Sequence, residues 1–170
     1  MTKNIGIFSL TSALAVGVLA AQDAIETLAT VDVIGSSENV LGLTGSGAFI
    51  EAEDYQRKGI TNIQQILRKV PGVYIREEDG FGNFPNISLR GGDGTRNEKV
   101  TVMEDGILTA PAAYSAPSAY YSPRAGRMSG IEVLKGSSQI KYGPHTTGGV
   151  INFLSTEIPS EETFYTRNTY

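Results

Sequence analysis

Short stretches in which apolar and polar residues alternate recur from residue 73 onward. A period of two places successive side chains on opposite faces of a β-strand. The alternating apolar pairs are Val73 and Ile75, Ile87 and Leu89, Val100 and Val102, and Ile131 and Val133. The apolar run GGVINFLS, residues 148–155, predicts one further strand. Together these segments predict a small mixed β-sheet.

Two helical segments precede these strands. The sequence AFIEAEDYQRKG is typical of a strand end that leads into a short helix stopped by Gly59, because glycine tolerates positive φ. In the next segment Thr61 and Gln64 are placed as a capping pair, and Pro71 ends the helix. The residues of its apolar stripe are Ile63, Ile66, Leu67 and Val70. Short helices on a small mixed sheet indicate an α+β domain over residues 41–156.

The loops are long for so small a sheet. EDGFGNFPN separates two predicted strands, and about twenty residues, LTAPAAYSAPSAYYSPRAGRM, precede the next clear one. A loop of this length in a compact domain is usually functional.

The first forty residues differ from the domain. Residues 1–20 are apolar and small with Lys3 near the start, which predicts a signal peptide; a transmembrane anchor or a buried helix is the alternative. Residues 21–40 lack a large aromatic residue and are predicted to be mobile. Val31 and Val33 alternate with polar neighbours, as in a strand that another protein could pair with or in a first edge strand of the domain.

The composition excludes several classes of function. The formal charge of −4 argues against a nucleic-acid surface, and the absence of cysteine excludes disulfides and thiolate sites. His145 is the only histidine, and no nucleophile, metal or phosphate-loop motif accompanies it. The acidic run from Glu77 to Asp79 lacks the ligand spacing of an EF-hand loop and fits a solvated loop better than a calcium site. We therefore expect no enzyme activity and no cofactor.

Four motifs in order carry a family resemblance. LRKVPGVYI, ISLRGG, VTVMEDGI and IEVLKGSSQIKYGPHTTGGVINF resemble the plug domain of TonB-dependent outer-membrane receptors over residues 41–156. The form YGPHTTGGVINF is most similar to the ferric dicitrate receptor branch. The resemblance implies that a 22-stranded barrel encloses the domain. That barrel is absent from this chain, and residues 157–170 would be its link or the start of its first strand.

The resemblance also implies contacts between plug and barrel. Plug cations of the family face barrel carboxylates, and the matching positions are Arg90 and Lys135. Most members have arginine at the second position, and lysine lacks the forked contact of a guanidinium. An ordinary strand-end charge is the alternative for Arg90. Gly148 and Gly149 would pass close to the barrel wall, and Asn152 would need hydrogen-bond partners if it is buried there.

A TonB box is implied near the mature N-terminus. Such a stretch pairs as a strand with TonB, which belongs to an inner-membrane energising complex, and backbone hydrogen bonds carry most of the affinity. The best match consists of Ile25, Glu26, Thr27, Leu28, Ala29, Thr30 and Val31.

The long loops would contribute to a ligand pocket. Tyrosines offer flat amphipathic surfaces with hydroxyls, and cations would suit an anionic ferric chelate. The candidates are Phe81, Phe84, Tyr114, Tyr120, Tyr121, Arg96 and Arg124. Packing against the inner barrel wall is the alternative for the tyrosines.

The resemblance therefore implies a gate that also forms part of the ligand-binding floor of a receptor for active uptake of an iron chelate such as ferric citrate. Its partners would be TonB, the chelate, its own C-terminal barrel and the outer membrane of a Gram-negative bacterium. The alternative is a stand-alone plug-fold module that binds a ligand or partner without transport.

Overall fold

The computed structural model describes residues 34–78, 80, 84, 86–92, 97, 99–109, 121–143, 146–166 and 168. Seven short strands and two short α-helices form within these residues, and three 3-10 helices connect or flank them. The strands and α-helices are β1 (Ser46–Glu51), α1 (Ala52–Gln56), α2 (Ile63–Leu67), β2 (Val73–Ile75), β3 (Ile87–Leu89), β4 (Val100–Glu104), β5 (Ile107–Leu108), β6 (Met128–Lys135) and β7 (Gly149–Ser155). The 3-10 helices are Ser37–Gly42, Ala125–Arg127 and Gly136–Tyr142.

The strands form two sheets rather than the single sheet that the alternation predicted. The larger sheet has the order β1-β6-β7-β4-β5, and β2 pairs with β3 separately. Strands β4 and β7 run parallel, whereas the other pairs are antiparallel. The predicted mixed α+β character is therefore confirmed. Both β2 and β3 were predicted as strands, but the alternation could not show that they pair apart from the main sheet.

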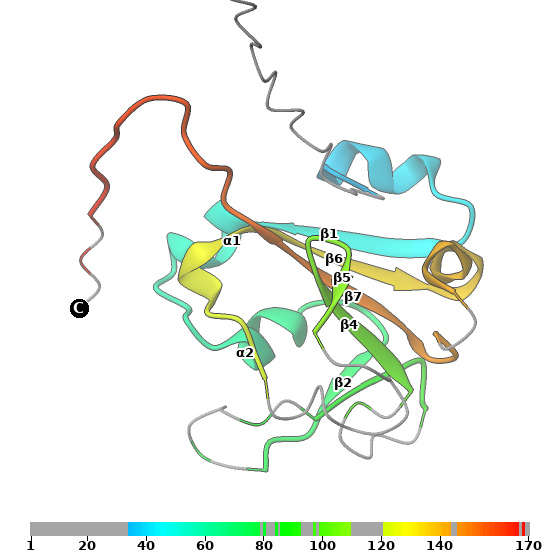
Figure 1. Cartoon of the computed structure of the whole chain (residues 1–170). Coiled ribbons are helices and arrows are strands. Elements are labelled where there is room, and N and C mark those ends of the chain that lie inside the picture. The colour runs from blue at the N-terminus through cyan, green and yellow to red at the C-terminus, as the bar shows by residue number, and fades with distance from the viewer. Residues whose placement is uncertain are drawn as a thin grey trace, which may run out of the picture.

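The five-stranded sheet is covered on both faces. Figure 1 shows α2 and β2 below the strands, α1 at the end of β1, and the N-terminal 3-10 helix Ser37–Gly42 above the strands. The larger core lies on the helical face, and its fully covered side chains include Tyr55, Ile66, Leu67, Ile131, Val133 and Ile151. A smaller cluster on the other face contains Ile34, Met103, Leu134 and Val150.

The predicted apolar stripe of the second helix is confirmed, but its cap is not the predicted one. Ile63, Ile66 and Leu67 are buried. The helix is capped by Asn62, whose side chain accepts a hydrogen bond from the Gln64 amide at 2.8 Å. Asn62 has the extended backbone of a cap residue, so the helix starts one residue later than a cap at Thr61 would require.

Residues 34–40, which lie in the segment predicted to be mobile, are part of the folded domain. Ile34 is 2% exposed, and residues 37–42 form a 3-10 helix that packs beside β1. The predicted signal peptide and the residues 25–31 of the predicted TonB box lie outside the described residues. At the other end, the described residues after Ser155 leave the body of the domain (Figure 1) and form no strand.

The Gly148–Gly149 pair allows a close approach within the domain itself. A Cβ at Gly148 would lie 2.6 Å from the Lys99 carbonyl oxygen. At Gly149, where φ is +149°, a Cβ would overlap the Leu89 side chain and lie 2.7 Å from the Leu134 oxygen. The space that we expected a barrel wall to need is therefore occupied by neighbouring parts of this chain.

Gly149→Ala should destabilise the domain, because the added methyl meets backbone and a packed leucine at a φ that alanine rarely adopts. We expect a loss of about 1–3 kcal/mol in the free energy of unfolding, measured by urea denaturation. Gly126→Ala is the matched control, since a Cβ at Gly126 meets nothing within 4 Å. Equal stability of the two variants would contradict the proposed crowding at Gly149.

Candidate functional site

The structure brings the two predicted plug cations together at one turn. Lys135, the last residue of β6, is 6% exposed, and its Nζ donates a hydrogen bond to the Pro71 oxygen at 2.7 Å. The Arg90 amide donates to the Gly72 oxygen at 2.8 Å. The Arg90 guanidinium lies beside Gly136, where a Cβ would be 2.8 Å from its Nη1 atom. The loop after β3 and the end of β6 therefore meet at the turn that follows α2.

The local electrostatics of this pair are unfavourable. Burial lowers the pKa of Lys135 below its ordinary value, and the positive charge of Arg90 lowers it further. Among the described residues no carboxylate forms a salt bridge with either cation. Arg90 is exposed and holds a positive φ of 56°, which is uncommon for a residue with a side chain. Two adjacent cations thus remain without an acidic partner in the described part of the chain.

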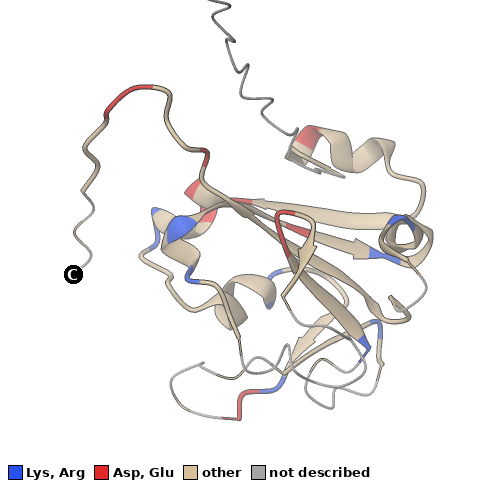
Figure 2. Ribbon diagram, viewed as in Figure 1, with Lys and Arg blue, Asp and Glu red and all other residues tan. Residues whose placement is uncertain are grey.

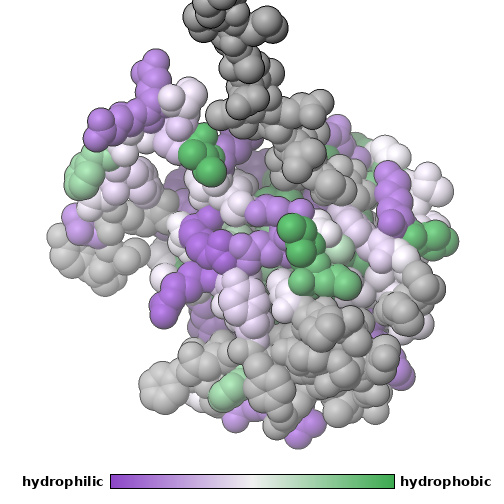
Figure 3. Space-filling model, in the orientation of Figure 1, coloured by the Kyte–Doolittle hydropathy of each residue, from purple (hydrophilic) through white to green (hydrophobic). Residues whose placement is uncertain are grey.

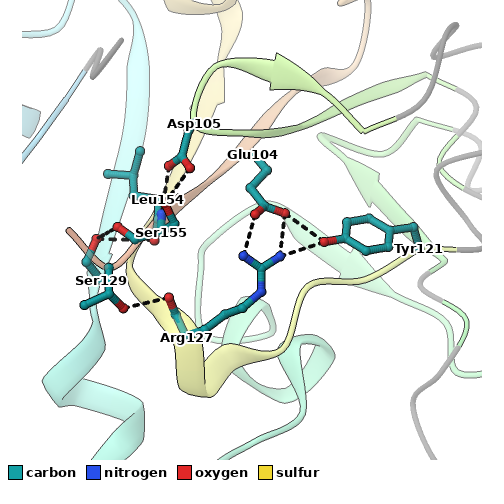
Figure 4. A network of polar contacts seen from close by, with 8 residues as sticks. Glu104, Asp105, Tyr121, Arg127, Ser129, Leu154 and Ser155 are labelled. Atoms are coloured by element: carbon teal, nitrogen blue, oxygen red, sulfur yellow. Dashed lines mark hydrogen bonds and ion pairs between the residues drawn. The ribbon is translucent and has the colours of Figure 1, made fainter. Parts of the chain in front are cut away.

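A second polar cluster joins the end of β4 to the end of the long loop. Glu104 accepts two hydrogen bonds from Arg127, at 2.6 and 2.8 Å, and a third from the Tyr121 hydroxyl at 2.8 Å. The Arg127 Nη2 atom also donates to the Tyr121 oxygen at 2.7 Å. Figure 4 shows the three side chains closing a ring of contacts. The forked Arg127 contact fixes the direction in which Tyr121 points.

The cluster alters the protonation of its members. The hydrogen bond from Arg127 lowers the pKa of Glu104 below its ordinary value, against the effect of partial burial. Burial and the Glu104 carboxylate raise the pKa of Tyr121. At neutral pH Glu104 is therefore charged and Tyr121 keeps its proton, as the observed donors and acceptors require.

The same region fixes the path of the chain as it leaves β7. Asp105, in the turn between β4 and β5, accepts hydrogen bonds from the Ser155 amide at 2.8 Å and from the Ser155 hydroxyl. The Ser129 hydroxyl donates to the Ser155 oxygen at 3.0 Å, and the Thr156 amide donates to the Arg127 oxygen at 3.0 Å. These hydrogen bonds hold the end of β7 beside the Glu104 cluster, where Figure 4 shows Ser155 next to Asp105 and Ser129.

Only some of the predicted ligand-binding residues are described. Tyr121 is 41% exposed, and Phe84 is 43% exposed with its carbonyl accepting a hydrogen bond from Gln64 on α2 at 3.0 Å. Arg124 is exposed at the start of the 3-10 helix Ala125–Arg127. The predicted residues outside the described part are Phe81, Arg96, Tyr114 and Tyr120.

Asn152 contacts this domain rather than a barrel. It is fully buried, its Nδ2 donates to Glu132 at 2.9 Å, and its Oδ1 accepts from the Gly106 amide at 2.9 Å. The requirement for hydrogen-bond partners is met, but the expected contact with a barrel does not fit this burial.

Sequence reasoning missed three charged residues, namely Glu104 and Arg127 of the second cluster and Glu132, the partner of Asn152. Glu132 alternates with Ile131 and Val133 and therefore resembles a residue on a solvated face. Glu104 precedes an Asp-Gly turn and Arg127 closes the long loop, but a pairing of residues so far apart in the sequence leaves no local signal near either of them.

The described surface combines dispersed charges with an apolar patch on β5. Figure 2 shows basic residues distributed over several elements, with acidic residues among them. Ile107 and Leu108 of β5 are 72% and 49% exposed, and an apolar patch lies over this part of the molecule in Figure 3. The described residues contain no helix long and apolar enough to cross a membrane, and no metal-binding group of three ligands.

Comparison with known proteins gives the family. The family model of the TonB-dependent receptor plug domain matches residues 39–150. This chain belongs to that family. The plug fold predicted from the four motifs is thereby confirmed.

Solved structures give the same result. The ferric citrate transporter FecA in its unliganded form is 31% identical, with a TM-score of 0.65, over 75% of this chain and 20% of that chain. The ferric enterobactin receptor PfeA from Pseudomonas aeruginosa is 25% identical, with a TM-score of 0.54, over 74% of this chain and 19% of that chain. The siderophore receptor PirA from Acinetobacter baumannii, 24% identical with a TM-score of 0.54 over 74% and 19%, shares the fold. This chain thus spans about a fifth of the length of each receptor.

Arg127→Lys should raise the pKa of Glu104 toward its ordinary value, because lysine keeps the charge but loses the forked contact. A carbon-detected NMR titration of the Glu104 carboxyl would measure this. Because the folded-state pKa of Glu104 lies below 4.5, the pair stabilises the domain above that pH and the stabilisation is lost as pH falls through the folded-state pKa.

Arg57→Lys is the control for this prediction, since Arg57 and Glu53 are 3.9 Å apart and highly exposed on and just after α1. It should leave the pH dependence of unfolding unchanged. If Arg127→Lys did not move the Glu104 titration, the forked contact would not be formed in solution.

Proposed function

We propose that this plug domain is the gate and part of the ligand-binding floor of an outer-membrane receptor that takes up an iron chelate. The observation that carries the proposal is the pairing of Arg90 with the buried Lys135. Like charges repel, and the energetic cost is larger where water is partly excluded. A surrounding wall that carries carboxylates would offset this repulsion, and the two cations would then latch the plug to its barrel.

The proposed latch has an asymmetry. The Lys135 ammonium already has a carbonyl partner on Pro71, whereas the Arg90 guanidinium is exposed and has five donors. Arg90 would therefore make the forked contact with a barrel carboxylate, and Lys135 would add charge without a fork.

The iron chelate is proposed from the similar receptors. FecA is described as a ferric citrate transporter and PfeA as a ferric enterobactin receptor. The FecA match agrees with the likeness of residues 141–153 to the ferric dicitrate branch, so ferric citrate is the ligand that we propose first. Tyr121, held by Glu104 and Arg127, and the exposed Arg124 would contribute to the floor together with Phe81, Phe84, Arg96, Tyr114 and Tyr120.

The remaining parts of the proposal concern energy and location. Residues 25–31 would pair with TonB, and TonB would draw on its inner-membrane energising complex. The chain would be exported by a signal peptide in residues 1–20 and would reside in the outer membrane of a Gram-negative bacterium. It would bind and gate without catalysing a reaction.

The intact mass of the native product tests whether the plug serves a transporter. We expect a mass several-fold above 18.1 kDa when the product is recovered from outer membranes with an antibody against residues 41–156. A mass near that of the chain without residues 1–20 would instead identify a stand-alone binding module, and transport would be abandoned.

Replacing Tyr114, Tyr120 and Tyr121 together with alanine should weaken ferric citrate binding by the complete receptor. We expect about a tenfold loss of affinity or more, because buried aromatic contacts often contribute over 1 kcal/mol each. Tyr121→Phe separates the hydroxyl contact with Glu104 from the ring. Tyr74→Ala, at a 60% exposed tyrosine on β2, is the control. Unchanged affinity and uptake in the triple variant would remove these loops from the ligand floor.

A further inference from the structure

Glu132 is a fully buried carboxylate in the middle of the main sheet. It lies on β6, with Phe49 of β1 and Asn152 of β7 as its cross-strand neighbours. A carboxylate removed from water is costly unless donors surround it. The donors to Glu132 that the structure shows come from two places, the N-terminal segment and β7.

The N-terminal segment supplies two of the donors through its backbone. The Ile34 amide donates to Glu132 Oε1 at 2.8 Å, and the Gly35 amide donates to the same atom at 2.9 Å. The Ile34 oxygen in turn accepts a hydrogen bond from the Asn39 side chain at 2.8 Å. Both polar groups of the Ile34 backbone are therefore occupied.

The Ile34 side chain packs on the face of the sheet that carries this carboxylate. It belongs to the small apolar cluster with Met103, Leu134 and Val150 and is 2% exposed. Gly47 leaves room for it, because a Cβ there would lie 3.3 Å from Ile34 Cδ1. Residue 34 is thus held by a polar and an apolar contact at the same point.

The second oxygen of Glu132 continues the contact across the sheet. Asn152 Nδ2 donates to Glu132 Oε2 at 2.9 Å, and Asn152 Oδ1 accepts from the Gly106 amide at 2.9 Å. Gly106 lies in the turn between β4 and β5. It follows Asp105, which contacts Ser155, and Asp105 in turn follows Glu104. One chain of hydrogen bonds therefore connects residues 34–35 to the turn that adjoins the Tyr121 cluster.

We infer that the Glu132 carboxylate fastens the N-terminal segment to the interior strand β6, and that Asn152 couples this fastening to the β4–β5 turn. A change at the turn that moves the Gly106 amide withdraws a partner from Asn152 and so alters the donors that Glu132 keeps. A pull on the chain before residue 34 therefore reaches β6 directly, through the hydrogen bonds of the Ile34 and Gly35 amides to Glu132.

The fastening rests on the described contacts alone. Its use in transport rests on the proposed function, in which TonB pulls residues 25–31, three residues before Ile34. The test below needs neither TonB nor a ligand, so its result is independent of whether uptake is confirmed.

The order of donors and acceptors makes a sharp test possible. In Glu132→Gln every orientation of the two side-chain amides leaves one donor facing another, either at residues 34–35, between residues 132 and 152, or at Gly106. In the double variant Glu132→Gln with Asn152→Asp, the glutamine oxygen accepts from residues 34–35, its nitrogen donates to Asp at 152, and the second Asp oxygen accepts from Gly106. The net charge is unchanged.

We expect the amides of Ile34, Gly35 and Gly106 to exchange with deuterium about tenfold faster or more in Glu132→Gln, measured by NMR on the full chain. The amides of Ile131 and Val133 should change by less than about threefold. The double variant should return the three affected amides to within about threefold of the unaltered protein. Glu53→Gln, at an exposed position of α1, should change the exchange rate of none of these amides.

Two results would overturn the inference. One is an unchanged exchange rate at Ile34 and Gly35 in Glu132→Gln; the other is a double variant that exchanges as fast as the single one. If Glu132→Gln does not fold, the unaltered protein decides the matter. Exchange of its Ile34 and Gly35 amides at the rate of an unstructured peptide would then contradict the fastening, and recovery of folding in the double variant would support it.

Discussion

The burial of β6 on both faces is the constraint on which the rest of the structure depends. This strand lies between β1 and β7, and its residues from 130 to 135 are all buried. Two of them, Glu132 and Lys135, carry charges that need partners from elsewhere in the chain. The N-terminal segment and Asn152 satisfy Glu132, and the Pro71 carbonyl satisfies Lys135 in part. The two charged positions thereby fix the N-terminal segment and the turn that follows α2.

The two charges are satisfied to different degrees. Glu132 accepts three hydrogen bonds, which compensate the carboxylate for the water that it loses inside the protein. Lys135 has one carbonyl oxygen and a neighbouring cation, and both its burial and the charge of Arg90 lower its pKa. The first charge therefore acts within the domain, whereas the second has capacity left for a partner outside it. This difference supports assigning the barrel contact to the Arg90 and Lys135 pair and not to Asn152.

The elements with a clear hydrophobic period could be predicted from the sequence. The stripe of α2 and the strands β2, β3, β4, β6 and β7 were located because burial on one face or both leaves a repeated pattern. The cap at Asn62 was missed because a neighbouring threonine satisfied the same rule. Glu132 was missed because alternation alone assigns every second residue of a strand to solvent. The cover over that face consists of residues 34–43, where Ile34, Val40 and Leu43 are too sparse to form a recognisable period.

The site could be predicted only where the family resemblance supplied positions. Arg90 and Lys135 are 45 residues apart, and their meeting at the Pro71 turn depends on the whole topology. The contact of Glu104 with Arg127 likewise joins the end of β4 to the end of the long loop. Such long-range polar pairs follow from the fold and leave no pattern in the sequence near either partner.

A contact through a carboxylate suits a segment that would leave and return if TonB pulls on residues 25–31, as proposed. While Ile34 and Gly35 are in place they bury Glu132 and satisfy it at the same time. When they leave they uncover the carboxylate, so water replaces the lost donors and no unpaired charge remains buried. The net cost of each exchanged hydrogen bond is then about 0.5–1.5 kcal/mol, although the bonds hold the geometry firmly when formed. An apolar residue at position 132 would lack this property, because departure of the segment would expose apolar surface that water does not compensate.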